Sequence, residues 1–556
     1  MREPLTTTTQ LLLGKTMRDA SRMINLGITL LAILISTPAC TQFGTLNESK
    51  VASASPNKSL LPTHVSKPPK QCLALSGGGM RAASYAIGVM KALSEFDQLD
   101  SLDMISGVSG GTYAMMLYYT GLYSQNGQST SDARVSSTHL FADENLSNFV
   151  KEHTQLHYGK HDALNAASTT AAGMTLAAWD APYFFPNKYI SRRVGDPLLF
   201  EHEGILRSFY RERLSEFYVN YGNASRRIPS LSELNTFVTK HHLPWLILNT
   251  TAYDSEDAKT FERKRIFEVT PLMLGSDSAG YTHVTTKLGV SGDKAMDKSL
   301  IDYVMASGAA LDVPLSKPSH FIRASIKLGL GLEIHAPTSS GGESKLLYLA
   351  DGAFSENLGA YALAMRKCEV ITIVDAEYDP WFHFEGYYVL KKHVNEGLGM
   401  RLAVGDVDTH LDNVVMNPIA CPDGSIECDP PISTWQHPLM KGAISITRKA
   451  TNTNASDAKK LEVRYLKLSV DRTKKTTVLA PMPEKQCTVG GDQETPELYF
   501  SKHLINQIDP ESRDPKFPQI DTLNQWLLEN RVKALIDLGY AHMKALICQN
   551  QMSPVK

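Results

Sequence analysis

The sequence lacks the charge surplus and the repeats that mark several large classes of protein. Its 556 residues carry a formal net charge of −2, so no basic surface for nucleic acid is expected. No repeat period of about 20–50 residues is visible, which argues against a solenoid. Hydrophobic residues make up 42% and charged residues 21%, which is enough material for a large folded core.

Motifs for phosphate and metal binding are missing as well. The glycine-rich stretch SGGGMR, residues 76–81, has neither the lysine spacing of a Walker loop nor the pattern of a dinucleotide-binding turn. The cysteine spacings fit no zinc pattern, and no cluster of histidines accompanies them. We therefore expect no metal and no cofactor.

Cysteine is scarce, and the chain has seven: Cys40, Cys72, Cys368, Cys421, Cys428, Cys487 and Cys548. If Cys40 carries a lipid, six remain, and in an oxidising compartment some of these could pair. The best local candidate is Cys421 with Cys428, because the Pro-Asp-Gly turn in CPDGSIEC folds the chain back on itself. Free thiols are an equally good interpretation.

The N-terminus has the order of a secretory signal. From Met17 onward, two arginines precede an apolar run from Ile24 to about Ile35, and small residues follow before Cys40. The run is shorter than the ~20 apolar residues of a membrane-spanning helix. We interpret residues 1–39 as a signal peptide, and an anchor that is never cleaved is the alternative.

The residues STPAC, which end at Cys40, resemble a bacterial lipoprotein box, in which a lipidated cysteine becomes the first mature residue. Ala39 fits this box, whereas Thr37 replaces its usual large aliphatic residue. Residues 41–69 are rich in Ser, Pro and Lys, which is typical of a flexible tether. We therefore expect residues 40–69 to tie an exported lipoprotein to a bacterial membrane surface, at the outer membrane or the periplasmic face.

Residues 70–556 are expected to form one catalytic domain. The stretches CLAL at 72–75 and LDMIS at 102–106 each have the character of a buried strand, followed by a glycine turn and a helix. Two such units in succession predict a parallel sheet with crossover helices. Further strands of the same sheet, covered on both faces, are expected from the apolar runs at 244–251, 345–352 and 369–376.

Two regions differ from this scheme. Residues 121–240 are mixed and partly polar, and we interpret them as a lid-like insertion over the site. Their aromatic cluster around Trp179 and Phe184 could dip into a lipid surface or pack under the lid. In the tail, GAISIT and VRYLKLSV predict an edge hairpin, and a helical pattern runs through residues 521–546.

One serine lies between glycines at a strand-to-helix turn, in GVSGG at residues 107–111. Such a turn exposes the serine and directs its hydroxyl out of the sheet, and the glycines leave room for strained backbone. The helix that follows points its N-terminus, with its partial positive charge, at the reaction. Ser109 is therefore a candidate nucleophile, although Gly-x-Ser-x-Gly alone has low specificity.

A serine nucleophile also needs a base and donors for an oxyanion. Gly77, Gly78 and Gly79 can turn successive N–H groups towards one point, and Arg81 adds a positive charge nearby. Asp351 ends the strand-like run YLADG, where a partly desolvated carboxylate with a raised pKa could accept the serine proton. An ordinary Asp-Gly turn is the alternative.

Taken together and in this order, Gly77–Arg81, Gly107–Gly111 and Asp351–Ala353 resemble the patatin-like phospholipase family. The forms SGGGMRA and SGVSGG are also similar to the related cytosolic phospholipases. The match runs from about Cys72 to Asp375, and a serine replaces the aspartate that many members carry before the triple glycine. The resemblance implies a three-layer α/β/α fold with a central, mostly parallel sheet.

The resemblance also implies a chemistry that uses a Ser–Asp dyad in place of a triad. Ser109 would be the nucleophile and Asp351 the base. The N–H groups of Gly77–Gly79 would form the oxyanion hole, and Arg81 would steady an anionic head group or that loop. The implied activity is a serine lipid acyl hydrolase of the phospholipase A or lysophospholipase type, acting on membrane lipid through an acyl-enzyme without a metal.

Two alternatives remain open at this point. An α/β-hydrolase esterase would use a Ser–Asp–His triad, and six histidines follow Asp351: His383, His393, His410, His437, His503 and His542. The other alternative is a catalytically silent lipoprotein that binds lipid or a partner.

Overall fold

The computed structural model describes a set of segments that together make one folded body. These are residues 61–62, 64–126, 135–147, 150, 211, 218, 228–254, 265–276, 280–284, 298–309, 332–336, 345–413, 435, 437–446, 460–470, 517–520, 522 and 527–552. The predicted signal peptide, Cys40, most of the tether and most of the predicted lid, with Trp179 and Phe184, lie outside the described residues.

Twelve strands and the helices around them make up the described fold. The strands are β1 (Gln71–Leu75), β2 (Met104–Val108), β3 (Trp245–Asp254), β4 (Arg265–Val269), β5 (Met273–Ser276), β6 (Gly280–His283), β7 (Leu332–Ala336), β8 (Lys345–Asp351), β9 (Val370–Asp375), β10 (Met400–Val404), β11 (Leu439–Ile446) and β12 (Lys460–Lys467). The α-helices are α2 (Gly79–Glu95), α3 (Gly110–Asn126), α7 (Leu231–Lys240), α8 (Leu300–Ser307), α10 (Tyr361–Met365), α11 (Glu385–Leu398), α12 (Gly405–Asn413) and α14 (Glu529–Met552), and the 3-10 turns are η2 (Leu99–Ser101) and η5 (Gly352–Phe354).

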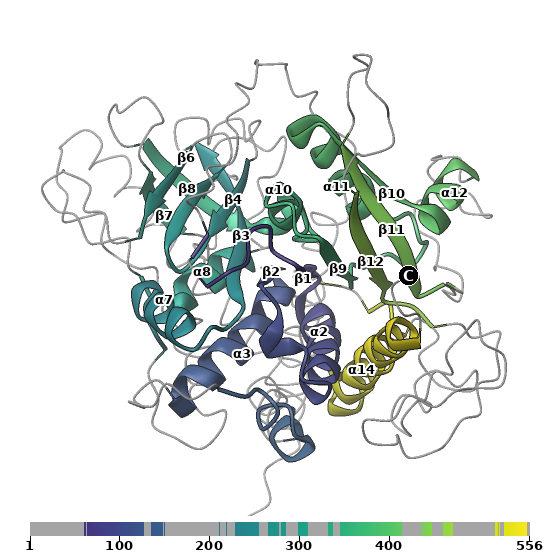
Figure 1. Ribbon diagram of the computed structural model, residues 1–556, viewed down its shortest axis with the longest axis horizontal. Coiled ribbons are helices and arrows are strands. Elements are labelled where there is room, and N and C mark those ends of the chain that lie inside the picture. The colour runs from purple at the N-terminus through teal and green to yellow at the C-terminus, as the bar shows by residue number, and fades with distance from the viewer. Residues whose placement is uncertain are drawn as a thin grey trace, which may run out of the picture.

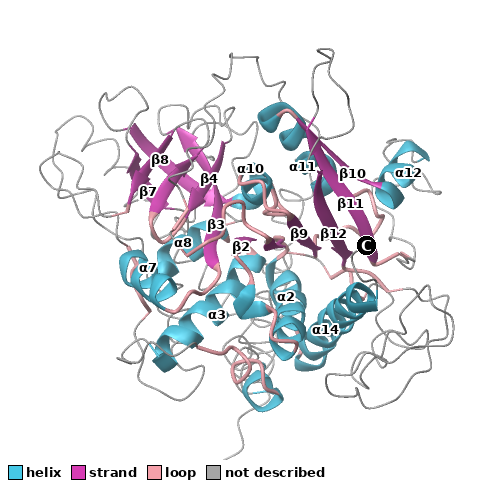
Figure 2. Cartoon of the chain, in the orientation of Figure 1, coloured by secondary structure: helices cyan, strands magenta, loops and turns pink. Residues whose placement is uncertain are grey.

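All twelve strands belong to one sheet, in the order β10-β11-β12-β9-β1-β2-β3-β4-β5-β6, with β8 paired to β3 and to β7. The five central strands from β12 to β3 are parallel, and the strands on both flanks are antiparallel. In Figure 1, α2, α3 and α14 lie on one side of the central strands, and α10 and α11 lie on the other. The predicted parallel core with covering helices is confirmed (Figure 2).

The central strands are buried because their residues are apolar along their whole length. Cys72 to Leu75 of β1 and all five residues of β2 are buried. A parallel strand that is covered by helices on both faces has no solvent side, so it needs no alternation of polar residues. This is the reason that CLAL and LDMIS predict buried strands correctly.

Three details of the fold differ from the prediction. The run at 345–352 forms β8, which is antiparallel to β3 rather than part of the parallel core. The predicted hairpin of β11 and β12 is not at the edge, because β12 pairs with β9 and β10 covers β11. The last helix starts at Glu529, later than the helical pattern from residue 521.

The C-terminal helix packs tightly on the helix that follows the triple glycine. A Cβ at Gly88 of α2 would overlap the carbonyl of Ile536, and a Cβ at Gly539 of α14 would overlap the carbonyl of Tyr85. Glycine at both positions therefore lets the two backbones touch. Together with β12, this contact makes the C-terminal third part of the same core.

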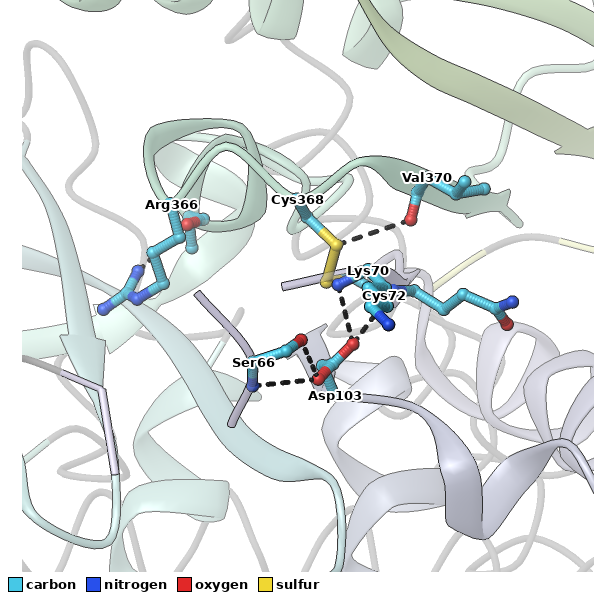
Figure 3. The surroundings of a disulfide bond; sticks show 9 residues. Ser66, Lys70, Cys72, Asp103, Arg366, Cys368 and Val370 are labelled. Atoms are coloured by element: carbon cyan, nitrogen blue, oxygen red, sulfur yellow. Dashed lines mark hydrogen bonds between the residues drawn. A yellow bond between two sulfur atoms is a disulfide. The ribbon is translucent and has the colours of Figure 1, made fainter. Parts of the chain in front are cut away.

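A disulfide joins Cys72 in β1 to Cys368, which lies just before the neighbouring strand β9 (Figure 3). The two cysteines are 296 positions apart in sequence, and both are buried. Cross-linking a segment this long restricts the unfolded chain, and disulfides typically stabilise a fold by roughly 2–4 kcal/mol. The predicted Cys421–Cys428 pair lies outside the described residues.

Asp103, beside this disulfide in Figure 3, fixes the chain that leads into β1. Its carboxylate accepts hydrogen bonds from the Ser66 hydroxyl at 2.6 Å and from the Lys70 N–H at 2.7 Å.

Among the helices that the structure describes, none combines the length and the apolar character that crossing a membrane requires.

Candidate active site

Strand β3 brings the ends of β2 and β8 together. β2 pairs with the first half of β3 and ends with Val108 opposite Asn249, whereas β8 pairs with the second half and ends with Asp351 opposite Thr250. Because β4 occupies the other edge of β3, β2 and β8 follow one another along the same edge. The residue after Val108 therefore meets Asp351 at the carboxyl ends of the parallel strands, where α/β proteins place their sites.

Ser109 forms the turn between β2 and α3. Its φ of 45° lies in the left-handed region, which is strained for a residue with a side chain. The Thr112 N–H and hydroxyl hold the turn, because both donate to the Ser109 carbonyl, at 2.9 and 2.6 Å. A Cβ at Gly110 would overlap the carbonyl of Gly79, so this position requires glycine. The strained turn directs the Ser109 side chain out of the sheet.

Asp351 lies within hydrogen-bond reach of this serine. The Ala353 N–H donates to Oδ1 of Asp351 at 2.8 Å, and the Ser109 hydroxyl is near enough to this carboxyl group to lower its pKa by hydrogen bonding. Burial raises the pKa of Asp351 to about 7, although these two hydrogen bonds favour the ionised form. The carboxylate is therefore paired with the serine and is basic enough to take its proton near neutral pH.

A polar network that the sequence did not reveal supports the turn. The Ser109 N–H donates to the Ser307 hydroxyl at 2.9 Å, and this hydroxyl donates to the Asn249 carbonyl at 2.7 Å. The Asn249 side chain donates to the Ser106 hydroxyl and to the Gly107 carbonyl. Neither Ser307 nor Asn249 lies in a recognisable motif, because only the pairing of β3 and the packing of α8 bring them to Ser109.

The triple glycine lies next to Ser109, as predicted, but its three N–H groups differ. The Gly77 N–H donates to the Asn357 carbonyl at 2.9 Å and is therefore engaged. Gly78 and Gly79 have φ values of 134° and 60°, and their N–H groups have no hydrogen-bond partner among the described residues. Gly79 begins α2 and touches Gly110 at the start of α3, so two helix N-termini meet beside the serine.

Arg81 is buried, and its guanidinium lies against Gly78 of the glycine loop. Its guanidinium donates to the carbonyls of Ala376 and Ile520 and to the Thr522 hydroxyl, and it lies over the Tyr378 ring. Of the two predicted roles, this geometry favours the steadying of the loop. The partners come from the C-terminal third, which the motif could not indicate.

Charged residues behind the glycine loop form a second group that the sequence did not reveal. Lys467 lies between Asp375 at 2.8 Å and Asp379 at 3.0 Å, and both its own side chain and that of Asp375 are fully buried. The nearby Glu377 accepts a hydrogen bond from the Asn357 side chain at 2.5 Å. Asn357 lies in the stretch DGAFSENLGA at residues 351–360, but no pattern in this stretch marks the residue.

Three of the described histidines that follow Asp351 have hydrogen-bond partners away from this carboxylate. His393 is bonded to the Ser355 carbonyl, His410 to the Phe382 carbonyl, and His542 to the Tyr85 hydroxyl. His503 lies outside the described residues. In the part of the chain that the structure covers, no three histidine, cysteine, aspartate or glutamate side chains are arranged to hold a metal ion.

A cavity of about 360 Å³ lies at the opposite end of the strands. Its lining includes His64, Asp103 and His242. Asp103 directly precedes β2, and His242 lies shortly before β3, so the cavity is at the amino ends of the strands. Ser109 follows the carboxyl end of β2, and the cavity is therefore not part of the site around this serine.

Among known proteins, similarity to this chain is found in solved structures and in a family model. No curated protein sequence matches the chain at a significant level. Among solved structures, human GIVD cytosolic phospholipase A2 is similar, with a TM-score of 0.46 and 12% identity over 87% of this chain and 60% of that chain. VipD from Legionella pneumophila has a TM-score of 0.22 and 14% identity over 86% of this chain and 68% of that chain. This chain thus spans 60% of the length of the human protein.

The family match covers the region that carries all three motifs. Residues 73–364 match the patatin-like phospholipase family, and they make up more than half of the chain. The match includes Ser109, Asp351 and the triple glycine, and it confirms the resemblance seen in the sequence. This chain belongs to the patatin-like phospholipase family.

Proposed function

We propose that this protein is a serine lipid acyl hydrolase of the phospholipase A or lysophospholipase type. The observation that carries the proposal is the position of Ser109 beside the buried Asp351 carboxylate, at the carboxyl ends of the central strands. A serine paired with a buried base beside unpartnered N–H groups is the arrangement that acyl transfer requires. The family match supports a lipid ester as the substrate.

The proposed mechanism assigns one task to each group. Asp351 takes the Ser109 proton while Oγ attacks the ester carbonyl, and the N–H groups of Gly78 and Gly79 stabilise the oxyanion. The proton passes to the departing alcohol, and an acyl-enzyme remains on Ser109. Water then attacks the acyl group, with its proton taken by Asp351, and the fatty acid leaves as Ser109 regains its proton.

The test is fatty-acid release from vesicles of mixed phospholipids by the purified protein. Release of free fatty acid is expected, and the other product shows which ester was cleaved. No release from phospholipid, lysophospholipid or neutral ester would remove the proposal and favour the silent lipid-binding lipoprotein. The partners of His393, His410 and His542, given above, weigh against the triad alternative.

The pH dependence of kcat/KM should report the titration of Asp351. Because the base must be ionised and its pKa is about 7, kcat/KM is expected to rise roughly tenfold per pH unit below that value and to level off near it. Glu356 is a competing carboxylate, since burial raises its pKa to about 7 as well. The control is Glu356→Gln, in which kcat/KM should still rise with pH as in wild type. Loss of this rise in Glu356→Gln would contradict the assignment to Asp351.

We also propose that Cys40 is lipidated and holds the protein on a bacterial membrane surface after export. The buried Cys72–Cys368 disulfide supports export, because such bonds form and persist in oxidising compartments. Wild-type protein is expected to incorporate labelled palmitate, and Cys40→Ser is expected to lose the label. Equal labelling of the two proteins would contradict lipidation at Cys40. Cys421→Ser is the control, and this variant should keep the label.

A further inference from the structure

Asn357 borders the space beside the nucleophile. Its backbone carbonyl accepts the Gly77 N–H at 2.9 Å, which fixes the residue to the glycine loop. A methyl group built on Gly77 would overlap Oδ1 of Asn357 and would lie 3.2 Å from Cβ of Ser109. The carboxamide oxygen and the serine side chain therefore face the same small space.

The oxygen of this carboxamide is a buried acceptor without a donor. Oδ1 of Asn357 has no hydrogen-bond partner among the residues that the structure describes. The nitrogen of the same carboxamide points the other way and donates to Oε1 of Glu377 at 2.5 Å. An acceptor that faces a developing oxyanion has the wrong sign for catalysis, whereas a donor at the same place would stabilise it.

A half-turn of the carboxamide exchanges its oxygen and its nitrogen, and Glu377 decides which orientation is favoured. An ionised carboxylate only accepts hydrogen bonds, so it holds the Asn357 nitrogen. A protonated carboxyl group can donate its O–H to the Asn357 oxygen, which turns the nitrogen towards Ser109. The second oxygen of Glu377 is fixed, because Oε2 accepts the Gly386 N–H at 3.0 Å.

The groups around Glu377 place its pKa near physiological pH. Burial and the carboxylate of Asp375 raise the pKa of Glu377 to about 8, with a further contribution from Asp379, although Lys467 and the Asn357 amide lower it. The hydroxyl of Tyr465 lies on the same cluster and donates to Asp375 at 2.5 Å. Glu377 is thus protonated at neutral pH and ionises at mildly alkaline pH.

We propose that Asn357 is an additional oxyanion donor, and that Glu377 is the positioning residue that turns its amide nitrogen towards or away from the Ser109 site. The inference rests on the proposed hydrolase function. It predicts that kcat falls on the alkaline side when Glu377 ionises, because the carboxamide then presents oxygen instead of nitrogen to the oxyanion.

The experiment measures kcat and KM for p-nitrophenyl butyrate from about pH 6 to about pH 10. Wild type is expected to lose about 100-fold in kcat between about pH 8 and pH 10, the size of effect that one oxyanion donor produces at the lower end of its range. Glu377→Gln should abolish this fall. Its carbonyl must face the Gly386 N–H, so its amide donates to the Asn357 oxygen and locks the nitrogen in the site.

Two further variants separate this role from a structural one. Asn357→Ala should lower kcat about 100-fold at neutral pH, with KM nearly unchanged and with no alkaline fall. Glu385→Gln is the matched control, because Glu385 is the neighbouring carboxylate at the start of α11. It should keep the wild-type alkaline fall.

A second measurement detects the proposed hydrogen bond from the Asn357 amide to the oxyanion without requiring catalytic turnover. An alkyl fluorophosphonate would place a phosphoryl oxygen on Ser109 where the oxyanion forms. The ³¹P shift of this adduct should titrate near pH 8 in wild type and stay flat in Glu377→Gln. Two results would overturn this inference but leave the proposed function in place. One is a Glu377→Gln variant whose kcat still falls at alkaline pH as in wild type. The other is an Asn357→Ala variant in which only KM changes. If wild type shows no turnover and Ser109 is not labelled, the proposed function is overturned, and this inference with it.

Discussion

Replacing Ser109 by alanine is expected to lower kcat/KM for a fatty acyl ester by at least about 10⁴-fold, because no other group can form the acyl-enzyme. Asp351→Asn should cost a similar factor. The asparagine can still accept the Ala353 N–H, so the turn keeps its hydrogen bond, but the side chain cannot take the serine proton. Because members of one catalytic unit act together, the double variant should be hardly worse than either single variant.

The measurement is fatty-acid release from phospholipid vesicles, with circular dichroism of each variant to confirm folding. Ser101→Ala is the matched control, since Ser101 is an exposed serine that bonds to the Gln98 carbonyl. It should retain full activity. Substantial activity in Asp351→Asn would point to a histidine base instead, and activity in Ser109→Ala would remove the nucleophile assignment.

Replacing Lys467 by methionine is expected to lower the free energy of unfolding by about 3–5 kcal/mol, because the change leaves buried carboxylates without their cation. Burial alone would favour the neutral amine, but the carboxylates of Asp375, Asp379 and Glu377 raise the pKa of Lys467 above its ordinary value. The ammonium group also lies 4.8 Å from the centre of the Phe384 ring. Methionine has a similar volume, so the loss comes mainly from charge.

Urea unfolding of the full chain measures this loss. The matched control is Lys391→Met, which breaks the Lys391–Asp408 ion pair. Because both of these side chains are partly exposed to solvent, the cost should stay below about 1 kcal/mol. A second variant, Lys467→Met with Asp375→Asn and Asp379→Asn, should recover part of the lost stability. A loss below about 1 kcal/mol for Lys467→Met alone would show that the buried charges are not held by this lysine.

The parts of the site that could be predicted are those made by short stretches of chain. A strand, a glycine turn and a helix follow one another within 104–126, and this local order presents Ser109 whatever the rest of the chain does. The triple glycine before α2 is equally local. Asp351 could be predicted only by its place at the end of an apolar run, and its approach to Ser109 depends on β2 and β8 sharing one edge of β3.

The parts that could not be predicted depend on contacts between distant residues. Arg81 reaches Ile520, a residue 439 positions later, and this contact favours loop support over head-group binding, the two roles that the motif left open. The engaged Gly77 N–H could not be foreseen either, because it needs the Asn357 carbonyl. The antiparallel direction of β8 has the same cause, since an apolar run indicates burial but not direction.

The sequence by itself determined the turn at Ser109, the glycine loop, the buried strands and the family, because each depends on backbone sterics or apolar runs within a few residues. Only the tertiary structure decided which groups surround Ser109. Asp351, Ser307 and Asn357 reach it through strand pairing and helix packing, and Glu377 and Lys467 lie behind them through the pairing of β9 with β12. Burial, which sets the basicity of Asp351 and the charge of Glu377, arises only when these segments assemble.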